Sequence, residues 1–142
     1  MSLTRGEKER KTALHMAAES DFADTAEVLL SFGADVSLRA NHDSTALHLA
    51  AKNQSCRVLG QILEKIKHVD SNLVNARDAE GRTPLFVCTA AGRRGQGRGA
   101  TECMAALLNQ RAAVDEADDT GDTPLHMAAI GNATLFPNFF TF

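Results

Sequence analysis

The sequence predicts an all-α fold, a solenoid of stacked helix–turn–helix units joined by short β-hairpin or turn connections. Three observations predict it. A threonine-led motif recurs along the 142-residue chain, a pair of large apolar residues follows each of its first three copies, and turns rich in Asp and Gly precede the last two. The composition agrees, because Ala and Leu supply most of the apolar mass while Trp and Tyr are absent, which favours short, closely packed helices over a sheet sandwich.

The threonine-led motif is expected to form the first helix of each unit. Its copies are residues 12–18 (Thr-Ala-Leu-His-Met-Ala-Ala), 45–51 (Thr-Ala-Leu-His-Leu-Ala-Ala), 83–89 (Thr-Pro-Leu-Phe-Val-Cys-Thr) and 123–129 (Thr-Pro-Leu-His-Met-Ala-Ala). A threonine at a helix start can cap free backbone N–H groups, and a proline directly after it costs no hydrogen bond. Leu14, Ala17 and Ala18 fall on one helical face. The motif therefore predicts four equivalent short helices.

Paired apolar residues mark the second helix of a unit, at 29–30, 62–63 and 107–108. In the first unit we expect residues 28–30 to form the buried side of that helix and Gly33 to end it in a left-handed cap. Truncation of Leu29 or Leu107 to Ala is expected to cost about 2–5 kcal/mol. No such helix pair buries its apolar face alone, so neighbouring units must stack.

With four in-register copies, the last of them truncated, the chain resembles the ankyrin repeat family, whose unit reads Thr-Pro-Leu-His, two alanines, a helix ending in Leu-Leu, and Gly-Ala-Asp. The resemblance implies an array over residues 7–135, with units at roughly 7–39, 40–77, 78–117 and 118–135, after a leader at 1–6. It also implies that His15, His48 and His126 bond to the threonine hydroxyl and to the backbone of a neighbouring unit, so they are not metal ligands.

Two units depart from the pattern. The second is five residues longer than the first, and helical spacing of apolar residues continues past Leu63, which indicates an extended second helix with Lys65, Lys67 and His68 in solvent. The third carries a glycine-rich insertion at 93–99, expected to be a flexible surface loop. Its arginines, Arg93, Arg94 and Arg98, could instead bind a phosphate, a nucleic acid or an acidic partner.

The fourth unit stops after its first helix and is followed by a Phe-rich tail at 136–142. Pro137 prevents a helix from continuing there. The tail has three open interpretations: a hydrophobic docking peptide, a cap folded over the end of the stack, or a truncated product. We expect a monomer, with association through the uncapped C-terminal end as an option.

No catalytic site, metal site or cofactor is predicted. The chain has a net charge of −3, and its apolar runs are too short to cross a membrane. The odd number of cysteines, Cys56, Cys88 and Cys103, argues against a disulfide framework and for a reducing, intracellular location in cytoplasm or nucleus. Cys56 is expected to face solvent near a helix start, with a mildly lowered pKa.

The resemblance implies that a partner protein binds a concave face built from hairpin tips and first helices. By register, the contact positions are Lys8, Glu9, Lys11, Asn41, His42, Ser44, Lys52, Asn53, Glu80, Arg82, Asp119, Thr120 and Asp122, with Glu19, Ser20, Ala79, Ala90 and Ala91 also on that face. The net charge of −3 is too small to indicate a nucleic-acid or membrane partner, and neither is expected.

Charge is graded along the predicted face. Its first end is basic (Lys8, Arg10, Lys11) and its last end acidic (Glu116, Asp118, Asp119, Asp122). A bipolar ligand would be steered into one orientation, mainly through its association rate. The alternatives to a binding scaffold are a regulatory segment of a larger enzyme, channel or transcription regulator, and nucleic-acid or acidic-partner binding through loop 93–99.

Overall fold

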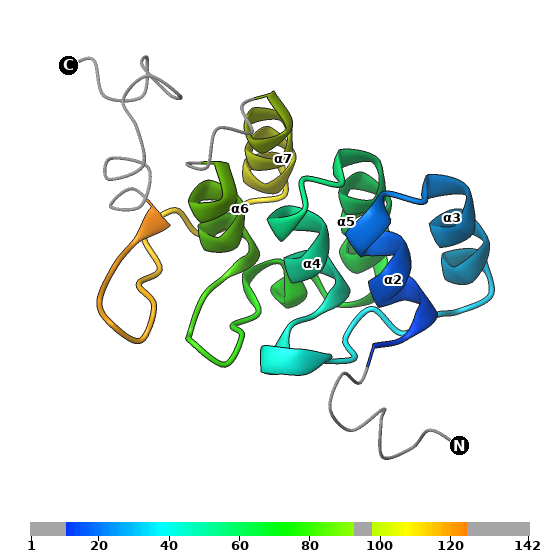
Figure 1. Cartoon of the computed structure of the whole chain (residues 1–142), viewed down its shortest axis with the longest axis horizontal. Coiled ribbons are helices and arrows are strands. Elements are labelled where there is room, and N and C mark those ends of the chain that lie inside the picture. Colours follow the sequence, from blue (N-terminus) through cyan, green and yellow to red (C-terminus); the bar gives the residue numbers. More distant parts are fainter. Residues whose placement is uncertain (1–10, 93–97, 125–142) are drawn as a thin grey trace.

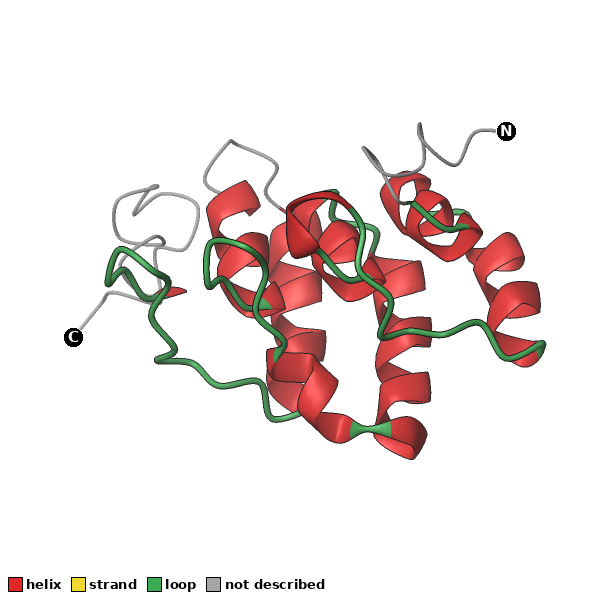
Figure 2. Ribbon diagram, turned by 90° about the horizontal axis from the view of Figure 1, so that it is seen from below, coloured by secondary structure: helices red, strands yellow, loops and turns green. Residues whose placement is uncertain are grey.

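The computed structural model describes residues 11–92 and 98–124. The α-helices in these residues are α2 (Ala13–Ser20), α3 (Ala23–Ser31), α4 (Ala46–Lys52), α5 (Cys56–Val69), α6 (Pro84–Gly92) and α7 (Arg98–Asn109), with short 3₁₀ helices η1 (Asn41–Asp43) and η2 (Ser71–Asn75). In one row α4 packs between α2 and α6, and in a second row α5 packs between α3 and α7 (Figure 1). The described residues contain no strand, and seen from below the helix pairs stand side by side (Figure 2). The predicted all-α stack is confirmed.

The recurring threonines start the first helices as predicted. Thr12 and Thr45 accept a hydrogen bond from the backbone N–H of the residue three positions later, and in both cases a histidine at that position bonds back to the threonine N–H. This reciprocal arrangement is a capping box, which satisfies two backbone donors that would otherwise have no partner. Thr83 likewise accepts from the N–H of Phe86. The motif therefore fixes where each first helix begins.

Small residues let the two rows approach closely. Ala17 and Ala18 in α2, and Ala50 and Ala51 in α4, are at most 1% exposed. Larger side chains fill the space between the rows, and the fully buried ones include Leu47, Leu59, Ile62 and Leu107. Burial of this apolar surface, shared between neighbouring units, stabilises the stack.

The prediction for the second helix of the first unit is partly wrong. Val28 is 54% exposed and Leu29 only half-buried, whereas Ala26 and Leu30 form the buried side of α3. The spacing of Ala26 and Leu30 by one helical turn leaves Val28 on the other side of the helix. The anchor in α3 is therefore Leu30, while Leu107 is fully buried, as expected.

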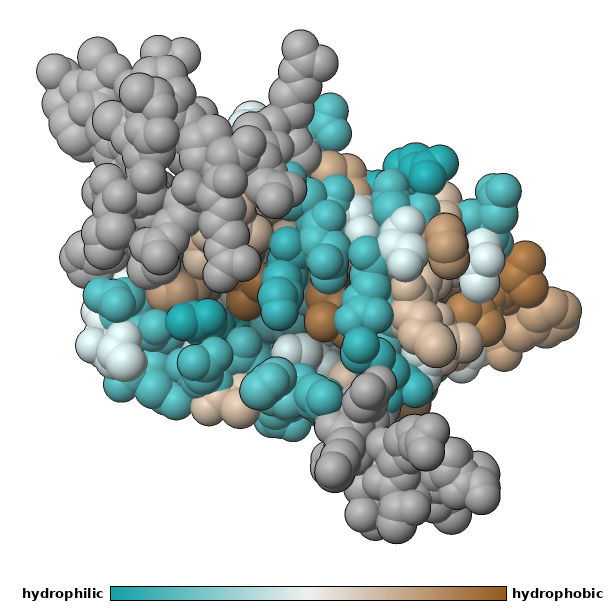
Figure 3. Space-filling view, in the orientation of Figure 1, coloured by the Kyte–Doolittle hydropathy of each residue, from teal (hydrophilic) through white to brown (hydrophobic). Residues whose placement is uncertain are grey.

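The first unit also has an exposed apolar end. The large apolar side chains exposed in this unit are Met16, Phe22, Val28, Phe32 and Leu38, each at least 46% exposed. Figure 3 shows hydrophobic surface at the right-hand end of the molecule, where Figure 1 places α3. The sequence predicts the uncapped end of the stack at the C-terminus, which lies outside the described residues.

The two irregular units differ in how well they were predicted. Helix α5 continues to Val69 as expected, with Lys67 and His68 exposed, and η2 follows it in place of a glycine-led exit. The predicted loop 93–99 is too long, because α7 already begins at Arg98. The glycine after it lies in the first turn, where backbone N–H groups have no partner within the helix, so its presence there does not stop the helix from starting.

Candidate functional site

Three hairpin connections form one edge of the array, along the lower side of Figure 1. A backbone N–H closes each hairpin: Ala40 donates to Ser44 O at 2.7 Å, Asp78 to Arg82 O at 2.9 Å, and Asp118 to Asp122 O at 2.7 Å. The side chains of Asp78 and Asp118 also accept backbone N–H groups within their own hairpins. Each tip is therefore held in a single turn geometry.

The tips are also bonded to one another. The N–H of Ala79 donates to the carbonyl of His42 at 2.8 Å, and the N–H of Asp119 donates to the carbonyl of Glu80 at 2.9 Å. Gly81 has φ 77°, and a Cβ there would lie 2.9 Å from the backbone nitrogen of Asp119. Only glycine fits at this position, where the hairpin of the third unit (78–82, the third hairpin) meets that of the fourth unit (118–122, the fourth hairpin). The hairpins thus form a fixed edge.

Two arginines that were not predicted as functional residues reinforce this edge. Arg39 donates to the carbonyls of Asp43 and Arg77, and Arg77 donates to the carbonyls of Gly81 and Ala117. Each arginine therefore hydrogen-bonds to a carbonyl of the hairpin that follows it and to the carbonyl of the residue that precedes the next hairpin. The signal was present, since an arginine stands six residues before the threonine in two successive copies.

A groove of about 580 Å³ lies between the hairpins and the first helices. Eight of the predicted contact residues line it: Lys11, Asn41, His42, Ser44, Lys52, Asn53, Glu80 and Arg82, together with Glu19, Ala90 and Ala91 from the same predicted face. Five lining residues were not predicted: Ala40, His48, Leu49, Asp78 and Val87. The groove therefore draws its lining from three successive units.

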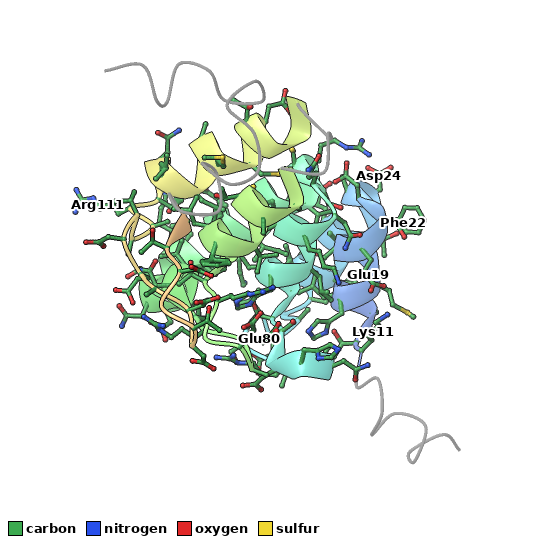
Figure 4. All side chains as sticks on the ribbon, turned by 60° about the vertical axis from the view of Figure 1, so that its left-hand side comes forward. Lys11, Glu19, Phe22, Asp24, Glu80 and Arg111 are labelled. Carbon is green, nitrogen blue, oxygen red and sulfur yellow. The ribbon has the colours of Figure 1, made fainter. Side chains whose placement is uncertain are left out.

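The groove lining contains an ion pair as well as apolar residues. Lys11 Nζ lies 2.8 Å from Glu19 Oε2, and these two side chains lie together beside α2 (Figure 4). Leu49 is 9% exposed and Val87 half-buried, so both remain partly accessible to a ligand. The groove combines charged, amide and aliphatic groups, the mixture found at protein interfaces.

Arg82 lies between two carboxylates and an aromatic ring. Its Nη1 lies 3.6 Å from Glu80 Oε1 and its Nε 3.9 Å from Asp118 Oδ2. Its guanidinium carbon stands 5.3 Å from the centre of the Phe86 ring, within the range of a cation–π contact. Arg82 therefore supports the groove wall as well as lining it.

Not every predicted contact residue lies in the groove. Asp119, Thr120 and Asp122 belong to the fourth hairpin and do not line it. Lys8 and Glu9 lie outside the described residues, as do Arg93 and Arg94, the leader 1–6 and the tail 136–142. Arg98 lies in the first turn of α7. The described groove is thus confined to the first three units.

A family model described as ankyrin repeats (3 copies) matches residues 2–75 and 58–136. The chain belongs to the ankyrin repeat family. Ankyrin repeats generally mediate protein–protein interaction and are typically non-catalytic. The predicted family is therefore confirmed, and the groove is a surface of an ankyrin array.

Relatives share this array as a small part of much longer proteins. Neurogenic locus notch homolog protein 1 of Homo sapiens is 34% identical over 122 residues, which are 86% of this chain and 4% of that protein. Rabankyrin-5 of Homo sapiens is 32% identical over 126 residues, 87% of this chain and 10% of that protein. Neurogenic locus notch homolog protein 2 of Homo sapiens is 35% identical over 120 residues, 84% of this chain and 4% of that protein.

The ankyrin histidines have the structural role that the resemblance implied. In His48, Nδ1 accepts from the N–H of Thr45 at 3.2 Å, so Nε2 carries the proton and donates to the carbonyl of Arg82 at 2.8 Å. His15 makes the equivalent bonds to Thr12 and to the carbonyl of Leu38. Burial is the largest factor and lowers the pKa of both histidines. His126 lies outside the described residues.

The acidic end of the array is partly compensated within the chain. Glu116 is ion-paired with Arg77. Burial alone would raise the pKa of Asp118, but hydrogen bonds from the Thr120 hydroxyl and from backbone N–H groups hold it below its usual value. Lys11, at the basic end, pairs with Glu19. These ion pairs reduce the charge gradient that the sequence predicts along the face.

The prediction for Cys56 is wrong. Its side chain is half-buried, and burial followed by the adjoining Cys103 thiol raises its pKa instead of lowering it. A helix start would lower the pKa of a thiol, but α7 covers Cys56 and its Cys103 thiol adjoins it. Within residues 11–92 and 98–124, no three His, Cys, Asp or Glu side chains are grouped to hold a metal, and no helix is long and apolar enough to cross a membrane.

Proposed function

We propose that this ankyrin array binds another protein along the groove of its first three units and performs no catalysis itself. The observation that carries the proposal is the groove: one continuous concavity lined by hairpin tips and first helices of successive units. Eight of the positions that family register assigned to partner contact line it. A ligand in this groove would touch all three units at once.

The fixed edge supports binding at low entropic cost. Backbone bonds close each hairpin and connect His42 to Ala79 and Glu80 to Asp119, so the tips do not need to be ordered when a partner arrives. Leu49 and Val87 offer apolar contact, while Asn41 and Glu80 offer polar groups. An extended segment or helix end matches this lining if it carries an acidic group for Lys52, a basic or amide group for Glu80, and one aliphatic side chain.

A substitution of Lys52 tests directly whether the partner binds in the groove. It lies exposed at the end of α4 and lines the groove, and no ion pair of it is found among the described residues. We predict that Lys52→Glu weakens binding of a partner captured from cell lysate by roughly tenfold, mostly through slower association at low salt. Binding is measured by biolayer interferometry against the purified partner, and circular dichroism verifies folding.

Lys67→Glu is the matched control. Lys67 is an exposed lysine on α5 that does not line the groove, and its pairing with Glu64 at 3.6 Å is of a surface kind that adds little stability. The control should bind as the original chain does. The proposal would be contradicted if Lys52→Glu bound the partner as tightly as the original chain does. It would also be contradicted if Lys67→Glu weakened binding as much as Lys52→Glu.

We further propose that the array works inside the cell, where three thiols stay reduced. A second candidate role, as an ankyrin segment within a larger protein, is favoured by one observation: the matching stretch is 4–10% of the relatives' lengths. Binding through the groove is common to both candidates.

A further inference from the structure

All three cysteines of the chain meet between the second and third units. Cys56 lies in α5, Cys88 in α6 and Cys103 in α7. Cys56 Sγ and Cys103 Sγ are 2.9 Å apart, joined by a thiol hydrogen bond. The Cys88 thiol also hydrogen-bonds to that of Cys103. Stacking has therefore brought together three thiols that are well separated in sequence.

The distance between Cys56 and Cys103 suits a disulfide. A disulfide requires an S–S separation of about 2.05 Å, so the two sulfurs must approach by about 0.9 Å from their separation of 2.9 Å. Their helices, α5 and α7, pack directly against each other. Small side-chain rotations can close such a gap without separating the helices.

The two thiols differ in access. Cys56 is half-buried, whereas Cys103 and Cys88 are fully buried. An oxidant from solvent therefore reaches Cys56 first, and Cys103 stands behind it as the second thiol. An accessible cysteine beside a resolving one is the geometry that disulfide formation through a sulfenic acid requires.

We propose that Cys56 and Cys103 are a modification site for peroxides, which convert the pair to a disulfide that clips the second unit to the third. The Cys56 thiol releases its proton, and the thiolate attacks one peroxide oxygen; the O–O bond breaks, and the hydroxide that leaves takes up the released proton as water, giving a sulfenic acid. Cys103 then attacks the sulfenic sulfur; the S–S bond forms, the S–O bond breaks, and the oxygen leaves as a second water. The two thiols lose two electrons, which reduce one hydrogen peroxide to two waters, and a dithiol reductant reverses the change.

The environment sets the resting state and the rate. Burial and the Cys103 thiol raise the pKa of Cys56, and Glu102 beside it acts in the same direction. Little thiolate is therefore present at neutral pH, so the pair stays reduced until peroxide persists.

The clip would stabilise the array. Cys56 and Cys103 are 47 positions apart, and the closed segment contains the third hairpin and α6. Closing a loop of this length restricts the unfolded chain strongly. The disulfide would cross-link the second helices of two neighbouring units, so that the units could not separate from each other by local unfolding.

The test treats the full chain with hydrogen peroxide and then measures intact mass, disulfide linkage in protease digests, and the melting temperature. We expect loss of two hydrogen atoms, a peptide pair containing Cys56 and Cys103, and a melting temperature higher by about 10 °C, all reversed by dithiothreitol. Cys56→Ala should abolish all three changes. The matched control Cys88→Ala should retain them.

Both variants are expected to fold, because each introduces the residue that another copy carries at that place: Ala23 for Cys56, and Ala17 and Ala50 for Cys88. Several results would overturn the proposal. They are an unchanged mass after treatment, a linkage of Cys103 to Cys88, dimers joined through Cys56, and an internal disulfide that persists in Cys56→Ala.

Discussion

Replacing Phe86 with alanine is expected to lower the free energy of unfolding by about 3–5 kcal/mol. Phe86 occupies the place that histidine holds in the other copies, and its ring is completely buried beneath the Arg82 guanidinium. Its removal leaves a cavity within the third unit and takes away the aromatic face that supports a groove residue. Urea unfolding followed by circular dichroism measures the loss.

The control for this prediction is the same substitution at an exposed site. Phe32 is 86% exposed at the end of α3, so Phe32→Ala should change the free energy of unfolding by less than about 0.5 kcal/mol. Equal losses of unfolding free energy in the two variants would mean that Phe86 is not buried against the neighbouring units.

His48→Leu is expected to cost roughly 2–4 kcal/mol. The imidazole joins two units, since it accepts from Thr45 in the second and donates to the carbonyl of Arg82 in the third. Leucine fills a similar volume but leaves a buried N–H and a carbonyl without their partner. The third hairpin loses its bond to α4, and urea unfolding should show a lower midpoint.

The same variant should alter the pH dependence of stability. Burial lowers the pKa of His48 below its ordinary value of 6.5, so below that pH the unfolded chain takes up a proton before the folded chain does. Stability is then complete above about pH 6.5 and falls as the pH decreases towards the folded pKa. His48→Leu should make this decline shallower, because only the loss of stability caused by His15 remains. Parallel stability curves for both proteins would contradict this account of the histidine.

The sequence predicted the helices more reliably than their buried faces. Threonine capping depends on local geometry, and Thr12, Thr45 and Thr83 start their helices as expected. The buried side of α3 depends on where that helix begins and on what packs against it, so the apolar run at 28–30 did not reveal that Val28 faces outward.

The family resemblance predicted many of the residues that line the groove. It did not predict all of the chemical groups found there. Register found residues at the hairpin tips and helix ends, such as Asn41 and Lys52. Leu49 and Val87 were missed because an apolar residue within a helical motif looks like core until the neighbouring unit is placed. The neighbourhood of Cys56 was missed for the same reason, since α7 covers it from another unit.

Photocrosslinking in cells tests the central claim most directly. A photoreactive amino acid is placed singly at two exposed groove positions, Lys52 and Glu80, and at two exposed positions of α5 outside the groove, Glu64 and Lys67. If the groove receives a partner protein, ultraviolet light should produce heavier covalent adducts from the first two positions and not from the second two. Adducts formed only from Glu64 and Lys67 would show that partners bind the opposite side of the array.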